Sequence, residues 1–229
     1  MFTLAAEPVP TVTARPGEPA PQPRLVATIR RAVGPVALAI GPVLGTLGMV
    51  LHPSGADDDT SLAASIAAHP EQWLASHLLL SVGWAVLAVG LASAARVARG
   101  RAGYLTMFGS VAGAAGATLM SLADVTHGVV AYALAGQVSP ARSIAIQTTY
   151  FHNPVIAAIM MGSMLLPAGV LALGASVLWS RAVHRWAGIT LLVSPLLIQA
   201  ADAAGPAEIL CGLPLVIGTS VLARAVWRA

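Results

Sequence analysis

Long apolar stretches alternate with short polar connections along this chain. A transmembrane helix needs about 20 mainly apolar residues, and six stretches approach or exceed that length. They cover residues 32–52, 73–95, 103–126, 153–179, 186–203 and 207–224. The pattern predicts an all-α fold, a polytopic bundle of six transmembrane helices.

The composition supports a membrane protein and excludes an ordinary soluble domain. Hydrophobic residues make up 57% of the 229 residues and charged residues only 9%, with a mean hydropathy of +0.79. A soluble domain carries about 25% charged residues. The length suits one bundle, so we assign residues 25–229 to a single transmembrane domain. Residues 1–24 are rich in proline and are predicted to form a disordered cytoplasmic tail.

The arginines give the predicted bundle an orientation. All twelve basic residues are arginine, and eleven of them flank the apolar stretches on one side of the predicted membrane. These eleven are Arg15, Arg24, Arg30, Arg31, Arg96, Arg99, Arg101, Arg181, Arg185, Arg224 and Arg228. Only Arg142 falls on the other side. Because cytoplasmic loops carry an excess of basic residues, we place both termini in the cytoplasm.

This charge pattern also bears on partners and localisation. The arginines lie at helix ends and form no patch for nucleic acid, so lipids are the expected surroundings. Arginine without lysine, together with abundant Ala, Gly and Val, is typical of a high-GC bacterium. We therefore predict a multi-pass protein of the bacterial cytoplasmic (inner) membrane.

Local motifs predict further structure. Asp59, Thr60 or Ser61 is suited to cap a short helix over residues 62–68, and Ser139 followed by Pro140 predicts a second one. Two pairs with small-xxx-small spacing predict close helix packing or a homo-oligomer face. These pairs are Gly41 with Gly45 and Gly109 with Gly113. The single cysteine, Cys211, excludes an internal disulfide.

Polar residues collect in the outer half of the predicted bundle. Ionisable groups inside a membrane are costly and are functional candidates by default. The outer polar set is His52, His77, Asp124, His127, His152, Asn153, Gln199, Asp202 and Glu208. We expect a polar cavity that opens outward or sideways into the outer leaflet. His52 and Glu208, like His69 and Glu71, also fit ordinary solvated helix ends.

The pattern Asp124-x-x-His127 places a carboxylate and an imidazole on one helix face. A carboxylate can fix the tautomer of an imidazole and raise its basicity. We predict Asp124 or Asp202 as a catalytic acid and His127 or His77 as a base. The predicted substrate-binding residues are Trp84, Tyr132, His152, Asn153, Gln199 and Glu208. Trp73 and Tyr150 fit an interfacial aromatic belt better than a substrate pocket.

In size, number of spans and carboxylate placement, the chain resembles small bacterial membrane-bound terpene cyclases, and it is similar to small six-helix actinobacterial membrane proteins. The likeness includes no diagnostic motif, and no residue role is carried over from it. It implies proton-initiated isomerisation or cyclisation of a lipophilic, isoprenoid-like substrate, for which no cofactor is required.

Two other function classes stay open at this point. His77, His127 and His152 would come from different helices at similar depth, which suits a haem or a divalent metal. Alternatively, the protein is a structural or transport subunit of a membrane complex, although the halves 32–126 and 153–224 show no internal repeat. Motifs of soluble hydrolases, metalloproteases and nucleotide-binding enzymes are absent from the sequence.

Overall fold

The computed structural model describes residues 24–53, 59–181, 183–200 and 206–229, and this part of the chain is helical without a strand. The all-α prediction is therefore confirmed. In chain order the elements are α1 (Arg24–Leu51), α2 (Asp59–Ala68), α3 (Pro70–Ala94), η1 (Ala95–Val97), η2 (Gly100–Ala102), α4 (Gly103–Leu134), α5 (Pro140–Phe151), α6 (Pro154–Ser163), α7 (Leu165–Ser180), α8 (Arg185–Ala200) and α9 (Pro206–Arg228).

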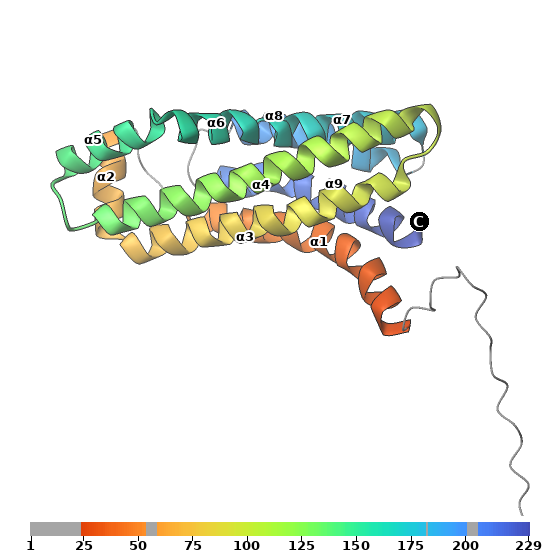
Figure 1. Cartoon of the computed structure of the whole chain (residues 1–229), viewed down its shortest axis with the longest axis horizontal. Coiled ribbons are helices and arrows are strands. Elements are labelled where there is room, and N and C mark those ends of the chain that lie inside the picture. The colour runs from red at the N-terminus through yellow and green to blue at the C-terminus, as the bar shows by residue number, and fades with distance from the viewer. Residues whose placement is uncertain (1–23, 54–58, 182, 201–205) are drawn as a thin grey trace, which may run out of the picture.

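The long helices lie side by side in one elongated bundle, and its two ends differ (Figure 1). The short helices α2 and α5 lie at one end, which we call the histidine end because His52, His127 and His152 lie near it. The opposite end holds the η1–η2 connection, the α7–α8 connection and the C-terminus. We call it the arginine end because the arginines of these segments gather there, whereas Arg142 lies at the histidine end on α5.

Five helices are long and apolar enough to cross a membrane. They are Arg31–Leu51, Pro70–Val97, Gly100–Leu134, Pro154–Ser180 and Leu210–Arg228. The predicted sixth span corresponds to α8, which has 16 residues. A helix of that length rises about 24 Å, which is shorter than the roughly 30 Å hydrocarbon core of a bilayer. The described residues thus contain five helices that are long and apolar enough to span a membrane, and α8 is a shorter apolar helix beside them.

Helix α4 is longer than the hydropathy predicts. The apolar stretch ends near residue 126, but the helix continues to Leu134 and has 32 residues. Its length of about 48 Å exceeds the bilayer core. Polar residues lower hydropathy without breaking a helix, and the turn that follows α4 contains Gly136, with a φ of 69°. His127 consequently lies on the same continuous helix as Asp124.

The small-xxx-small glycines pack helices within the chain. A Cβ on Gly41 would lie 2.6 Å from the Leu87 backbone nitrogen on α3, and one on Gly109 would lie 2.8 Å from the Gly169 carbonyl oxygen on α7. Close backbone approach is the recognised role of such glycines. Both faces are occupied inside one chain, so a homo-oligomer would use another surface.

The predicted short helices at the histidine end are present. Ser139 caps α5 by accepting a hydrogen bond from the Arg142 backbone nitrogen at 3.4 Å, with Pro140 at the start of the helix. Gln72 at the start of α3 donates to the Leu51 carbonyl oxygen at 2.9 Å. This hydrogen bond holds the C-terminal end of α1, where His52 follows, against α3.

Candidate functional site

Three histidines and a tryptophan from three segments gather at the histidine end. His52 follows α1, Trp73 and His77 lie one turn apart on α3, and His127 lies on α4. The centroid of the His77 ring lies 4.3 Å from that of Trp73 and 5.2 Å from those of both His52 and His127. We call these four residues the histidine cluster. They bring α1, α3 and α4 together above the apolar core.

The tautomer of His77 follows from its hydrogen bond. Its Nδ1 lies 3.0 Å from the Trp73 backbone carbonyl oxygen. A carbonyl oxygen only accepts, so Nδ1 carries the hydrogen and the neutral ring has its lone pair on Nε2. The side chain is buried, with 4% of its surface exposed. His77 is thus fixed in orientation by its own helix.

His127 has a polar atom that the protein leaves unpartnered. Its Nε2 is buried and has no hydrogen-bond partner. The ring meets Phe151 edge-on at 5.0 Å, and the side chain of Gln147 is a polar neighbour. Leaving a buried polar atom unsatisfied costs about 1–3 kcal/mol. Such an atom beside a cavity indicates a place for a ligand group or a water molecule.

A cavity of about 390 Å³ lies directly beside His127, between α2, α4 and α5. We call it the histidine pocket. Its polar lining comes from His127, Gln147, Thr148 and His152, and its apolar lining from Leu62, Ala63, Ile144 and Phe151. Two imidazoles from different helices therefore face one largely apolar space.

His152 is also held in a defined tautomer. Its Nδ1 lies 2.7 Å from the Thr148 carbonyl oxygen, so this nitrogen donates and Nε2 holds the lone pair. The residue ends α5 and is exposed. Its Nε2 is therefore left to interact with a ligand, as an acceptor when the ring is neutral and as a donor when the ring is protonated.

Asp124 has a different partner from the one that the sequence pattern favours. The carboxyl group is half-buried on α4 and forms a hydrogen bond with the Trp84 side chain of α3. It does not line the histidine pocket. Asp124 and Trp84 therefore link α3 to α4 below the histidine cluster, as do the hydroxyl oxygens of Ser81 and Ser121, 3.0 Å apart.

The remaining predicted site residues are dispersed. Tyr132 lies on α4 with 40% of its surface exposed and has no ring contact with the histidine cluster. Asn153 caps α6 by accepting from the Val155 backbone nitrogen at 2.9 Å. Asp202 lies outside the described residues, and so do the side chains of Gln199 on α8 and Glu208 on α9. Of the predicted set, His77 and His127 are in direct contact, and so are Asp124 and Trp84.

Two sequence interpretations need correction. Trp73 is only 1% exposed, so it does not belong to an interfacial belt. His52 is half-buried, with its ring 4.6 Å from that of Trp73, and is not a freely solvated helix end. Burial lowers the pKa of His52 below its ordinary value of 6.5, partly offset by a backbone hydrogen bond with Pro53. The i, i+4 spacing of Trp73 and His77 is the signal that indicates their contact.

Other interpretations agree with the structure. His69 and Glu71 are exposed, and so is His184 among the arginines. The hydroxyl group of Tyr150 lies 2.6 Å from the hydroxyl oxygen of Thr126, which links α5 to α4. Gln147 and Phe151, which the sequence interpretation did not select, complete the pocket beside His127.

The metal alternative finds no support in the described part of the chain, where no group of three His, Cys, Asp or Glu residues has the geometry to hold a metal ion. His127 and His152 share a pocket, whereas His77 does not line it. In comparisons with known proteins, no protein-family model matches this chain, and no curated protein sequence and no solved structure matches it either.

Proposed function

We propose that this protein is a multi-pass membrane enzyme that catalyses proton transfer on a lipophilic molecule bound in the histidine pocket. The observation that carries this proposal is the buried, unpartnered Nε2 of His127 on the wall of a cavity that also contains His152. An apolar pocket with a few convergent polar groups is the usual form of a small-molecule site.

The two imidazoles suit an isomerisation. Nε2 of His127 removes a proton from one carbon of the substrate, and the exposed His152, in its protonated form, delivers a proton from Nε2 to another. The substrate then leaves with the same composition and a shifted double bond. A cyclisation of an isoprenoid-like substrate uses the same two roles in the reverse order, with protonation first. General acid–base catalysis of this kind contributes about 10²–10⁴-fold to a rate.

The residues around the pocket act by positioning. His77 contacts His127 with its ring at 5.2 Å, edge to face, and limits the orientations of that imidazole. Asp124, one turn from His127 on α4, holds the helix against α3 through Trp84. Asp124 thus keeps a role in the proposed site, as a positioning residue in place of the predicted catalytic acid.

We infer that lipophilic substrates approach the bundle at this end. An open groove of about 940 Å³ follows α4, α5 and α6, with Arg142, Tyr150 and Asn153 among its lining residues. The same groove includes Val155, which is 65% exposed. A molecule with an apolar body and one polar group fits this combination.

The proposal includes the orientation of the bundle. We place the arginine end and both termini in the cytoplasm of a bacterium and the histidine end on the outside, with α8 as a short sixth span. The support is the gathering of the arginines at one end (Figure 1). The substrate would then enter from the outer leaflet.

The function is tested with His127→Gln and His152→Gln, and with His69→Gln as the control at an exposed position outside the pocket. Membranes that contain each variant are incubated in D₂O, and their neutral and isoprenoid lipids are analysed by mass spectrometry. We expect wild type and the control to form an isomer that differs in mass from the substrate only by the deuterium it has incorporated, and each pocket variant to do so at least about 10²-fold more slowly.

A matched measurement separates catalysis from folding. Thermal unfolding in detergent should show that His127→Gln and His152→Gln fold like wild type. Undiminished deuterium incorporation in both pocket variants would refute the proposed acid–base roles. Asp124→Asn should lower the rate less than His127→Gln, because Asp124 holds α4 against α3 and does not touch the substrate.

A further inference from the structure

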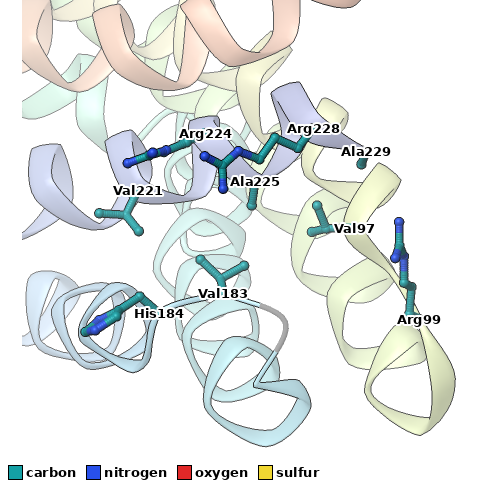
Figure 2. Close-up of a pocket in the computed structure, with 9 residues that line it drawn as sticks. All are labelled: Val97, Arg99, Val183, His184, Val221, Arg224, Ala225, Arg228 and Ala229. Carbon is teal, nitrogen blue, oxygen red and sulfur yellow. The ribbon is translucent and has the colours of Figure 1, made fainter.

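The arginine end holds a second polar pocket, which the proposed reaction does not use. This pocket has a volume of about 490 Å³ and lies between the η1–η2 connection, the α7–α8 connection and the end of α9. Figure 2 shows the side chains of Arg99, Arg224, Arg228 and His184 around it, with Val183 and Ala225 between them. We call it the arginine pocket.

The charged side chains that line the arginine pocket are all basic. Arg99, Arg224 and Arg228 are exposed, and no Asp or Glu is among the residues that line the pocket. Arg224 and Arg228 lie four residues apart on α9, so the two like charges repel one another. A bound anion would relieve this repulsion and would accept hydrogen bonds from the guanidinium groups.

His184 adds a donor of fixed position. The Trp186 backbone nitrogen donates to Nδ1 of His184 at 3.4 Å. When the ring is neutral, its hydrogen is therefore on Nε2, and this nitrogen is left as a donor for a ligand. Guanidinium groups bind phosphate oxygens in a bidentate manner, and an imidazole N–H supplies another hydrogen bond. The chemistry of the pocket thus fits a phosphate-bearing anion.

An apolar groove adjoins this pocket on the other side of α9. It has a volume of about 450 Å³ and lies between α1 and α9, where Val36, Ala39 and Trp227 line it. Val36 is 46% and Trp227 49% exposed. Arg224 and Arg228 border both the groove and the arginine pocket. The two arginines therefore separate a polar space from an apolar one.

We propose that the arginine end binds an anionic phospholipid, with its phosphate headgroup in the arginine pocket and one acyl chain along the α1–α9 groove. Basic pockets between helices at the cytoplasmic side of a membrane protein bind such headgroups, and an indole at the membrane surface is suited to cover an acyl chain. The adjoining groove favours a lipid over a free phosphate ion, which would use the arginine pocket alone.

The test measures the unfolding temperature of the purified, delipidated full chain in detergent, with added phosphatidylglycerol or phosphatidylcholine. We expect phosphatidylglycerol to raise it and phosphatidylcholine to leave it unchanged. The double variant Arg224→Gln/Arg228→Gln should require at least about tenfold more phosphatidylglycerol for the same rise, a loss of about 1.4 kcal/mol in binding. Arg101→Gln/Arg185→Gln removes the same charge from the same end, outside the pocket, and should respond like wild type.

Two further arms decide between a lipid site and its alternatives. Ala39→Phe fills the groove without a change of charge and should weaken the response to phosphatidylglycerol. Inorganic phosphate at matched ionic strength should give no comparable rise. Equal losses in the two arginine double variants would show only a general charge effect, and stabilisation by phosphate with no effect of Ala39→Phe would show a free-phosphate site. Either result overturns the lipid proposal.

Discussion

The indole of Trp73 lies against the imidazole of His77 with ring centroids 4.3 Å apart, and the Trp73 carbonyl oxygen accepts the hydrogen bond of the same imidazole. Trp73 thus sets both the position and the tautomer of His77. Because the indole also contacts His52 and His127, it is the common neighbour of all three histidines.

Trp73→Ala should cost about 3–5 kcal/mol of stability, the usual range for the loss of a large buried aromatic side chain. Trp73→Phe should cost clearly less, because the Trp73 Nε1 is buried without a partner and no hydrogen bond is lost with it. Equilibrium unfolding in mixed micelles, followed by circular dichroism, gives both values. If Trp73→Phe lost as much stability as Trp73→Ala, the result would indicate that the indole Nε1 has a hydrogen-bond partner.

Gly128→Ala should disturb the histidine cluster from the side of α4. A Cβ at this position would collide with the Cβ of His77 on α3. Overpacking of this kind costs about 1–3 kcal/mol. Gly45→Ala is the matched control, because the atom nearest to its Cβ would be the Trp84 ring at 3.8 Å, an ordinary contact.

The Gly128→Ala measurement combines unfolding with the chemical shifts of the histidine side chains. We expect the shifts of His77 and His127 to move in Gly128→Ala and to stay in place in Gly45→Ala. A fully stable Gly128→Ala with unchanged histidine shifts would contradict the close packing of α3 on α4.

The buried imidazole of His52 should make stability depend on pH. Burial lowers the pKa of His52 in the folded protein below 6.5, so below that pH the unfolded chain binds a proton more readily than the folded one. Stability is then complete above about pH 6.5 and decreases as the pH falls from 6.5 towards the folded pKa. Unfolding temperatures from pH 8 to pH 5 measure this decrease.

His52→Gln should flatten part of this pH dependence, whereas His69→Gln, at an exposed position, should not. His77 and His127 lie beside His52 and remain in both variants, so the difference between the two curves isolates His52. A steeper decrease with acid in His52→Gln than in wild type would show the opposite sign.

The orientation of the bundle is testable with single cysteines. Cys211 is the only cysteine of the chain, so Cys211→Ala gives a cysteine-free background for Arg142→Cys at the histidine end and Arg101→Cys at the arginine end. A membrane-impermeant maleimide should label Arg142→Cys in intact cells and Arg101→Cys only after permeabilisation. The reverse pattern would place the histidine end in the cytoplasm.

The histidine cluster and the histidine pocket could be predicted only in part. Depth along each helix follows from the sequence because helix rise is constant, and this placed His77 and His127 at one level. The direction of each side chain around its helix depends on which helices are neighbours. The sequence therefore did not reveal that Asp124 turns to Trp84, or that Gln147 and Phe151 of α5 complete the pocket.

The sequence by itself determined the helical class, the five long apolar helices and the two unlike ends of this protein, because hydropathy and arginine placement are properties of single segments. Only the tertiary structure decided that His52, Trp73, His77 and His127 meet, and that Arg224 and Arg228 stand between a polar pocket and an apolar groove. Those relationships join residues far apart in the chain, and the close packing of helices at glycines such as Gly41 and Gly109 selects which of them form.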